Sequence, residues 1–347
     1  MNLTSRNQRV PATRLALSLA LILLGRPTRA QKSPTLQYGD VTVEVMGLRH
    51  WSLRMLQDSL QRYAPGQTLA DAACMATLRY KMGFADASVT RFSGFDRTDP
   101  KRAFVSVRVL EPRPRSNWRA LPTGAFESLL PQYAPLILPV TDSTGAIWVG
   151  RLLFGFQIAD SAQRDQLLQS TNPEARVDYQ RLTDFLEANA GDAMKAMRVL
   201  DSSAAPGNRI VAALVLSKHP ERDESWHALI RALRDPHEGV RAAAATSLRR
   251  LPRRPMNWRP VAGELRLLLG GANVSEIESV MRLLMETQLD PALASSLAGG
   301  NSGWLLPMLD SRTPVTAYVT REFLKTLNRG SDLGSGSRAW RAWLAKL

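Results

Sequence analysis

Two clusters of arginine around a tryptophan are the residues of this chain best suited to bind a ligand. Guanidinium groups hold carboxylate or phosphate oxygens through paired hydrogen bonds, and they also stack on indole rings. The clusters therefore predict contact with an anionic partner, whereas the alternative is solvated arginines with the tryptophan folded onto the core. The first cluster comprises Arg249, Arg250, Arg253, Arg254 and Arg259 with Trp258, and the second comprises Arg113, Arg115 and Arg119 with Trp118.

The histidines, serines and glycines show no spacing typical of an active site or a metal site. No pair among His50, His219, His227 and His237 has the spacing that places two imidazoles on one helical face with a carboxylate between them. Neither Ser-x-x-Lys nor Gly-x-Ser-x-Gly occurs, and no glycine-rich phosphate loop follows a strand. We therefore expect no catalytic residue, no cofactor and no metal. An enzyme whose site lies in the irregular middle of the chain is the alternative.

The first cluster begins in the last residues of a well-defined helical unit that spans residues 229–251. Asp235 is suited to cap its second helix, Pro236 fits the first helical position, and Glu238 completes a capping box. The unit recurs, because five upstream residues align with five residues that lie 32 positions later. Arg209, Ala212, Ala213, Leu216 and Pro220 align with Arg241, Ala244, Ala245, Leu248 and Pro252.

With its Asp-Pro pair, its Val-Arg pair and its small residues before Leu, this unit resembles a HEAT repeat of the short bacterial, PBS-lyase-like kind. The resemblance implies an all-α solenoid over residues 172–330, a stack of helix pairs that usually holds other molecules. Ser275 and Glu278 form a second capping-box pair that predicts another helix start. Residues 331–347 are expected to form a capping helix at the end of the array. The same resemblance leaves a HEAT-like lyase that attaches bilin pigments as an alternative.

The residues upstream of position 112 predict an α+β domain with the order strand, helix, helix, strand, strand. Val41–Met46 alternates apolar and polar residues, as a half-buried strand does. A helix capped by Ser52 follows, and a second helix runs from Thr68 to Gly83, which can adopt the left-handed conformation that ends a helix. The two remaining strands are Ala87–Phe92 and Ala103–Val109, joined by a turn at Asp96–Pro100.

This order, with the segments VTVEVMGLRHWS, APGQTL and LRYKMGFADASV, resembles a POTRA domain of the bacterial envelope over residues 31–112. POTRA domains are protein-interaction modules, and the resemblance implies that the strand after the two helices lies at an edge of the sheet. An edge strand exposes backbone groups to which a partner strand can add. We therefore expect Ala87, Val89 and Arg91 to form a binding edge, unless the connector after Pro112 folds over it.

Residues 1–30 have the pattern of a secretory signal peptide. Arginines without any acid precede the apolar run Leu15–Leu24, and Ala30 is the small residue at the expected cleavage site. The apolar run is about half of the roughly 20 residues needed to span a bilayer. We therefore expect a soluble mature protein in the periplasm or outside the cell, without a transmembrane segment.

The remaining composition bears on the partners. The formal net charge is +14, and a basic exported protein suits an acidic protein surface, anionic lipid or polysaccharide rather than nucleic acid. Cys74 is the single cysteine, so no internal disulfide can form. Residues 113–171 are rich in proline and turn residues and predict a connector with short elements. Together these features predict a non-enzymatic interaction scaffold of the cell envelope.

Overall fold

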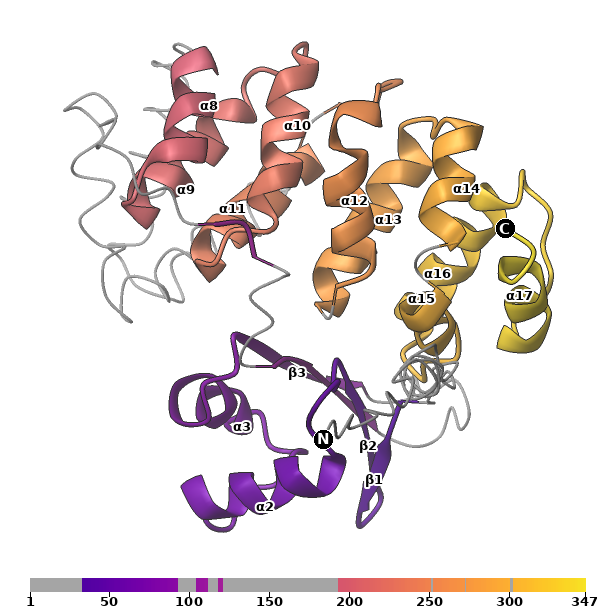
Figure 1. Cartoon of the computed structure of the whole chain (residues 1–347). Helices are drawn as coiled ribbons and strands as arrows, with labels where there is room; N and C mark the ends of the chain where they lie inside the picture. The colour runs from indigo at the N-terminus through magenta and orange to yellow at the C-terminus, as the bar shows by residue number, and fades with distance from the viewer. Residues whose placement is uncertain are drawn as a thin grey trace, which may run out of the picture.

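The computed structural model of the chain describes residues 33–92, 104–111, 118–120, 193–250, 252–271, 273–299 and 302–347. Within these ranges the chain forms a mixed four-stranded sheet near the N-terminus, followed by a helical region (Figure 1). Several predicted features lie outside the described residues. They are the signal peptide at 1–30, the turn at 96–100, the connector 113–171 apart from 118–120, and the helix that opens near residue 172.

The sheet has the strand order β1-β2-β4-β3. β2 and β4 run parallel at its centre, while β1 and β3 are antiparallel to their neighbours. The three predicted strands are confirmed, but β1 was not predicted, because its four residues are too few to show a period. Its pairing depends on a two-residue turn at which Gly39 has a φ of 55°. The strands are β1 (Thr35–Tyr38), β2 (Val41–Met46), β3 (Asp86–Phe92) and β4 (Phe104–Leu110).

The two predicted helices of this part differ in how well they match the sequence. Helix α2 (Leu53–Tyr63) begins as predicted, because the Ser52 hydroxyl accepts a hydrogen bond from the Met55 amide at 3.1 Å. The second helix is shorter than predicted. Thr68 donates its hydroxyl hydrogen bond to Asp71 at 2.9 Å within a turn. The helical residues are α3 (Cys74–Ala76) and the π-helical turn η1 (Thr77–Lys81), after which Gly83 has a φ of 73°.

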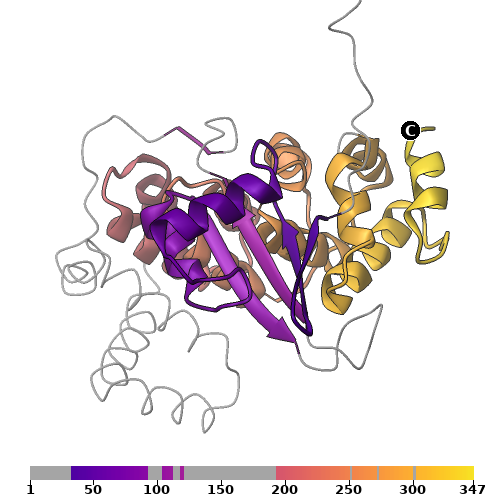
Figure 2. The same ribbon diagram turned by 90° about the horizontal axis from the view of Figure 1, so that it is seen from below.

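Both faces of the sheet are buried. Val43 and Val45 of β2 pack with Leu56 and Leu60 of α2 on one face. The predicted pattern left the polar residues of β2 facing solvent, which is wrong, since Glu44 on the opposite face is only 2% exposed. The helical region covers that face, so the sheet lies between α2 and the helical array (Figures 1 and 2).

The helical region is a row of helices around one continuous apolar core, which Met46 of β2 also enters (Figure 1). Trp340 of α17 (Ser337–Leu344), the last helix of the row, is fully buried and packs against the same core (Figure 1). In the described ranges, no helix combines the length and apolarity needed to cross a membrane. The helices are α8 (Ala193–Ser202), α9 (Pro206–Leu216), α10 (Asp223–Ala232), α11 (Glu238–Arg250), α12 (Ala262–Leu269), α13 (Val274–Glu286), α14 (Pro291–Gly299), α15 (Ser302–Leu309), α16 (Pro314–Leu327) and α17 (Ser337–Leu344).

The start of α13 differs from the predicted capping box. The Asn273 side chain accepts a hydrogen bond from the Glu276 amide at 3.2 Å, so Ser275 lies inside the helix and is not its cap. Glu278 is therefore free of the predicted capping role and pairs with Arg108 of β4 at 3.0 Å. A contact distant in sequence thus replaces the local one that the sequence suggested.

Polar contacts hold the sheet against the helical array. The carboxylate of Glu44 accepts hydrogen bonds from the Ser311 hydroxyl at 2.8 Å and from the Arg312 amide at 3.0 Å. Arg49 donates to the carbonyl of Gly270, and its guanidinium lies over the ring of Trp304. These contacts link β2 and the loop after it to parts of the helical array that lie more than 200 positions later in the chain.

Candidate functional site

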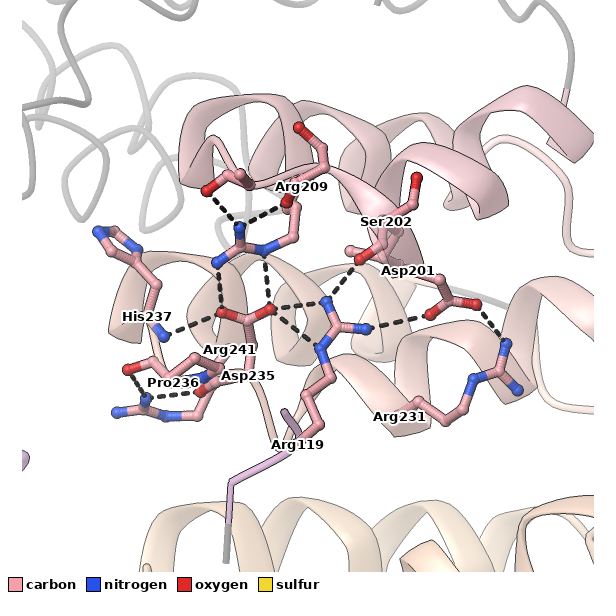
Figure 3. Close-up of polar contacts among 12 residues, drawn as sticks. Arg119, Asp201, Ser202, Arg209, Arg231, Asp235, Pro236, His237 and Arg241 are labelled. Carbon is pink, nitrogen blue, oxygen red and sulfur yellow. Dashed lines mark hydrogen bonds and ion pairs between the residues drawn. The ribbon is translucent and has the colours of Figure 1, made fainter. Parts of the chain in front are cut away.

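Asp235 lies at the centre of a buried ionic cluster where α8, α9 and the turn before α11 meet (Figure 3). The side chain is fully buried. Arg209 donates to Oδ1 from Nη2 and to Oδ2 from Nε, both at 2.9 Å, and the His237 amide donates to Oδ1 at 2.9 Å. Burial favours a raised pKa, but the hydrogen bonds of Arg209 and the charges of Arg119 and Arg209 outweigh it and hold the pKa of Asp235 below its usual value. Asp235 is thus an ionised buried carboxylate.

A segment far away in the sequence completes this cluster. Arg119 donates to Asp235 Oδ2 from Nη2 at 2.6 Å and to Asp201 Oδ1 from Nη1 at 3.0 Å. Its Nη2 also donates to the carbonyl of Leu200 at 2.5 Å, and its amide donates to the carbonyl of Arg234 at 2.7 Å. The amide and the side chain of Arg119 therefore both bind the array (Figure 3).

Trp118 contacts the array through a second arginine. The guanidinium of Arg241 lies over the Trp118 ring at 4.2 Å from its centroid, a cation-π geometry. Arg241 is itself 3% exposed and pairs with Glu276 at 2.9 Å. The indole therefore rests on a cation that the array already holds in place.

The arginines of neighbouring helix pairs make the same contacts. Arg209 Nη1 donates to the carbonyl of Ser203 at 2.8 Å, and Arg241 Nη1 donates to the carbonyl of Asp235 at 2.9 Å. Both the donors and the acceptors are related by the 32-residue alignment found in the sequence. Each arginine then reaches an acidic side chain of the following unit, Arg209 that of Asp235 and Arg241 that of Glu276. The sequence indicated the alignment, but the role of these arginines became visible only in the structure.

Glu276 is expected to make stability depend on pH. Burial raises the pKa of Glu276 to about 8, with Arg241 opposing and Asp86 adding to the shift. The native state then binds this proton more tightly than the unfolded state, so the free energy of unfolding should fall as pH rises from about 4.5 toward about 8. Glu276→Gln cannot release a proton and should flatten the profile. Thermal melts from pH 5 to pH 8.5 measure this, with Glu224→Gln as the exposed control, and parallel profiles for the parent and Glu276→Gln would contradict it.

The first arginine cluster binds carboxylates of the chain itself. Trp258 is 2% exposed and donates from Nε1 to the Thr287 hydroxyl at 2.9 Å, so its ring belongs to the core. Arg249 is exposed and donates to the Thr246 hydroxyl at 3.3 Å, while the side chain of Arg250 lies outside what the structure describes. The other members form ion pairs, which are Arg253–Glu286, Arg254–Asp223 and Arg259–Asp290.

In the second cluster, Arg113 and Arg115 lie outside the described residues, whereas Trp118 and Arg119 bind the array as described above. The sequence placed Trp118 and Arg119 among candidate ligand-binding residues in a connector. It did not indicate that Asp201 and Asp235 receive the arginine, because these carboxylates lie 82 and 116 positions away. The Asp-Pro pair was the visible signal, and it pointed only to a helix start.

The predicted binding edge is partly covered. β3 lies at the end of the strand order, as the sequence predicted. The outward carbonyl of Ala87 accepts from Arg79 Nε at 2.9 Å, and its amide donates to Asp86 Oδ1 at 2.8 Å. Backbone groups alternate in direction along a strand, so those of Val89 and Arg91 point the same way as those of Ala87. In the described part of the chain, neither the amide nor the carbonyl of Val89 has a partner on that side.

His50 and Glu111 form the one histidine–carboxylate contact that the structure describes in the N-terminal part. His50 Nδ1 lies 2.9 Å from Glu111 Oε2. The carboxylate oxygens of Glu111 also accept hydrogen bonds from the backbone amides of Arg49, His50 and Trp51. Since the carboxylate is bound mainly by backbone groups, it anchors the loop before α2.

Comparison of this chain with protein-family models, curated protein sequences and solved structures finds no match. In the ranges that the structure describes, no group of three histidine, cysteine or acidic side chains could hold a metal ion. The geometry of the site, with two carboxylates and a fixed arginine, is suited to hold an arginine and an aromatic ring of an extended chain.

Proposed function

We propose that this protein is a non-enzymatic interaction scaffold, exported to the bacterial cell envelope, in which a POTRA-like sheet and a HEAT-like solenoid bind protein partners. The apolar run and small residue before position 31 support export. The repeated contacts of Arg209 and Arg241 support stacked HEAT-like units, because each arginine donates from Nη1 to the carbonyl of the residue six positions before it, and the two contacts lie 32 residues apart.

The state of the β3 edge is the observation that carries the proposal. Arg79 and Asp86 bind the outward backbone groups of Ala87, whereas no residue that the structure describes binds the outward backbone groups of Val89 and Arg91. Thr90 and Arg91 are exposed, so a partner strand can approach this half of the edge. Edge strands that are not blunted in this way are common sites for the addition of a partner strand.

Val89→Pro is expected to abolish most capture of such a partner. Proline removes the outward amide of residue 89 and is tolerated at a sheet edge, so the remaining fold should persist. The measurement is a pull-down from envelope extract with the immobilised full chain, and circular dichroism checks that the helices are retained. Val89→Ala, which keeps the amide, is the matched control. Equal recovery of the same partners by parent and Val89→Pro would exclude the edge as the binding surface.

A further inference from the structure

We infer that Asp201, Asp235 and Arg241 form a peptide-recognition site for an aromatic residue followed by arginine, which residues 118–120 of the same chain occupy here. The inference deepens the proposed function, on which it rests, by naming the partner chemistry of one surface of the array. The partner it fits is a protein with an exposed segment of this kind, which competes with the chain's own Trp118 and Arg119.

The site offers an acceptor to each nitrogen of the arginine side chain. All three guanidinium nitrogens of Arg119 are bonded, Nε and Nη2 to Asp235, Nη1 to Asp201, and Nη2 in addition to the carbonyl of Leu200. The side chain is 14% exposed in this position. Carboxylates placed on two sides of a guanidinium select arginine over lysine, because the planar fork can meet them together.

The acceptors do not depend on Arg119 to stay in place. Arg209 binds both oxygens of Asp235, and Arg231 binds Asp201 Oδ2 at 3.0 Å. Each carboxylate therefore keeps one arginine of the array when the segment leaves. A site that is already ordered loses less conformational freedom when a ligand binds, which favours binding from outside.

The guanidinium of Arg241, on which the aromatic residue stacks, is also fixed by contacts within the array. Arg241 is held by Glu276 and by the carbonyls of Asp235 and Pro236, so its flat face is available to an indole or phenyl ring. Trp118 uses this face at 4.2 Å. The position for the aromatic residue and the position for the arginine are therefore close enough to be filled by two consecutive residues of one chain, as Trp118 and Arg119 do.

The pairing recurs elsewhere in the molecule. The string Asn-Trp-Arg occurs at 117–119 and again at 257–259. In the second copy Arg259 binds Asp290 at 3.1 Å, and Asp290 opens α14 just as Asp235 precedes α11. An arginine after a tryptophan therefore binds an Asp-Pro helix start twice, once within the array and once from outside its row of helices.

A groove beside the arginine position leaves room for flanking residues of a partner. It lies between α8 and α10, measures about 550 Å³, and is lined by Met194, Met197 and His227 next to the Asp201–Arg231 pair. Methionine side chains adapt to different apolar partners. The groove thus continues the site beyond the two positions that Trp118 and Arg119 fill.

Binding from outside must compete with a tethered segment. Arg119 follows Leu110 of β4 by only nine residues, so its effective concentration at the site is high. The parent protein is therefore expected to bind an added peptide weakly. Removing the arginine from the tethered segment should open the site.

The test uses the full chain and a fluorescent peptide of residues 116–121, Ser-Asn-Trp-Arg-Ala-Leu, followed by anisotropy. We expect Arg119→Ala to bind this peptide at least tenfold more tightly than the parent. A peptide with lysine in place of arginine should bind at least tenfold more weakly, and adding Asp201→Asn to Arg119→Ala should weaken binding similarly. Arg259→Ala is the matched control, which should bind no better than the parent.

Two outcomes overturn the inference. One is a folded Arg119→Ala protein that binds the peptide no better than the parent or does not distinguish arginine from lysine. The other is an Arg119→Ala protein whose melting temperature is lower than that of the parent and is not raised by the peptide. Loss of peptide binding leaves the pull-down result at β3 intact, and an empty pull-down leaves the peptide result intact, so the two proposals fail separately.

Discussion

Asp235→Ala is expected to lower the free energy of unfolding by about 3 to 5 kcal/mol, because it leaves buried arginine charges without their carboxylate. Among the described residues, Arg209, which is 1% exposed, would keep the carbonyls of Ser203 and Ala204 as its acceptors, and Arg119 would lose the Asp235 carboxylate. The role of a helix cap alone would cost about 1 kcal/mol. Denaturant unfolding followed by circular dichroism at 222 nm, with linear extrapolation, separates these two values.

Asp290→Ala is the matched control for this prediction. Asp290 also precedes a proline at a helix start, accepts the amides of Ala292 and Leu293, and pairs with Arg259, but this pair is exposed to solvent. Its removal should therefore lower stability much less than removal of Asp235. Similar losses for both variants would mean that Asp235 acts as a cap and that the buried cluster adds nothing.

Arg108→Ala is expected to lower the free energy of unfolding by about 3 kcal/mol and to loosen the sheet from the array. Arg108 binds Glu278 through two hydrogen bonds, at 3.0 and 3.2 Å, and donates to the Thr316 hydroxyl at 2.8 Å. The side chains of Arg108 and Glu278 are 18% and 13% exposed. Without the arginine, Glu278 is left in the interface with the Thr316 hydroxyl as its one partner among the described residues.

Amide hydrogen exchange locates this effect. We expect faster exchange in β2 and β4 of Arg108→Ala, while α10 and α11 keep the rates of the parent. Glu278→Gln, which keeps hydrogen-bonding groups without the charge, should cost less than Glu278→Ala. Arg54→Ala removes an exposed pair with Asp58 and serves as the control without a buried partner. Uniform acceleration throughout the chain would show that Arg108 does not act at this interface in particular.

The local elements could be predicted from the order of residues along the chain. Alternation set the bounds of β2 at Val41–Met46, and short-range hydrogen bonds set the start of α2 at Ser52. Gly83 ends the second helical segment with a positive φ, as its freedom from a Cβ allows. The alignment of Arg209 with Arg241 also came from sequence alone. All of these depend on residues close together in the chain or on a repeat, which a sequence shows directly.

Which polar groups contact one another could not be predicted without the packing of the elements. Glu44 and Arg108 look like the solvent side of strands, yet the array covers them, because α13 and the turn before α16 supply matching groups. In the sequence, Glu278 and Asp235 are recognisable only as residues of helix starts. In the structure, Glu278 binds Arg108, which lies 170 positions away, and Asp235 binds Arg119, which lies 116 positions away. Such pairings depend on how whole elements pack. The residue types alone do not show which two charged residues, far apart in the sequence, lie close together in the fold.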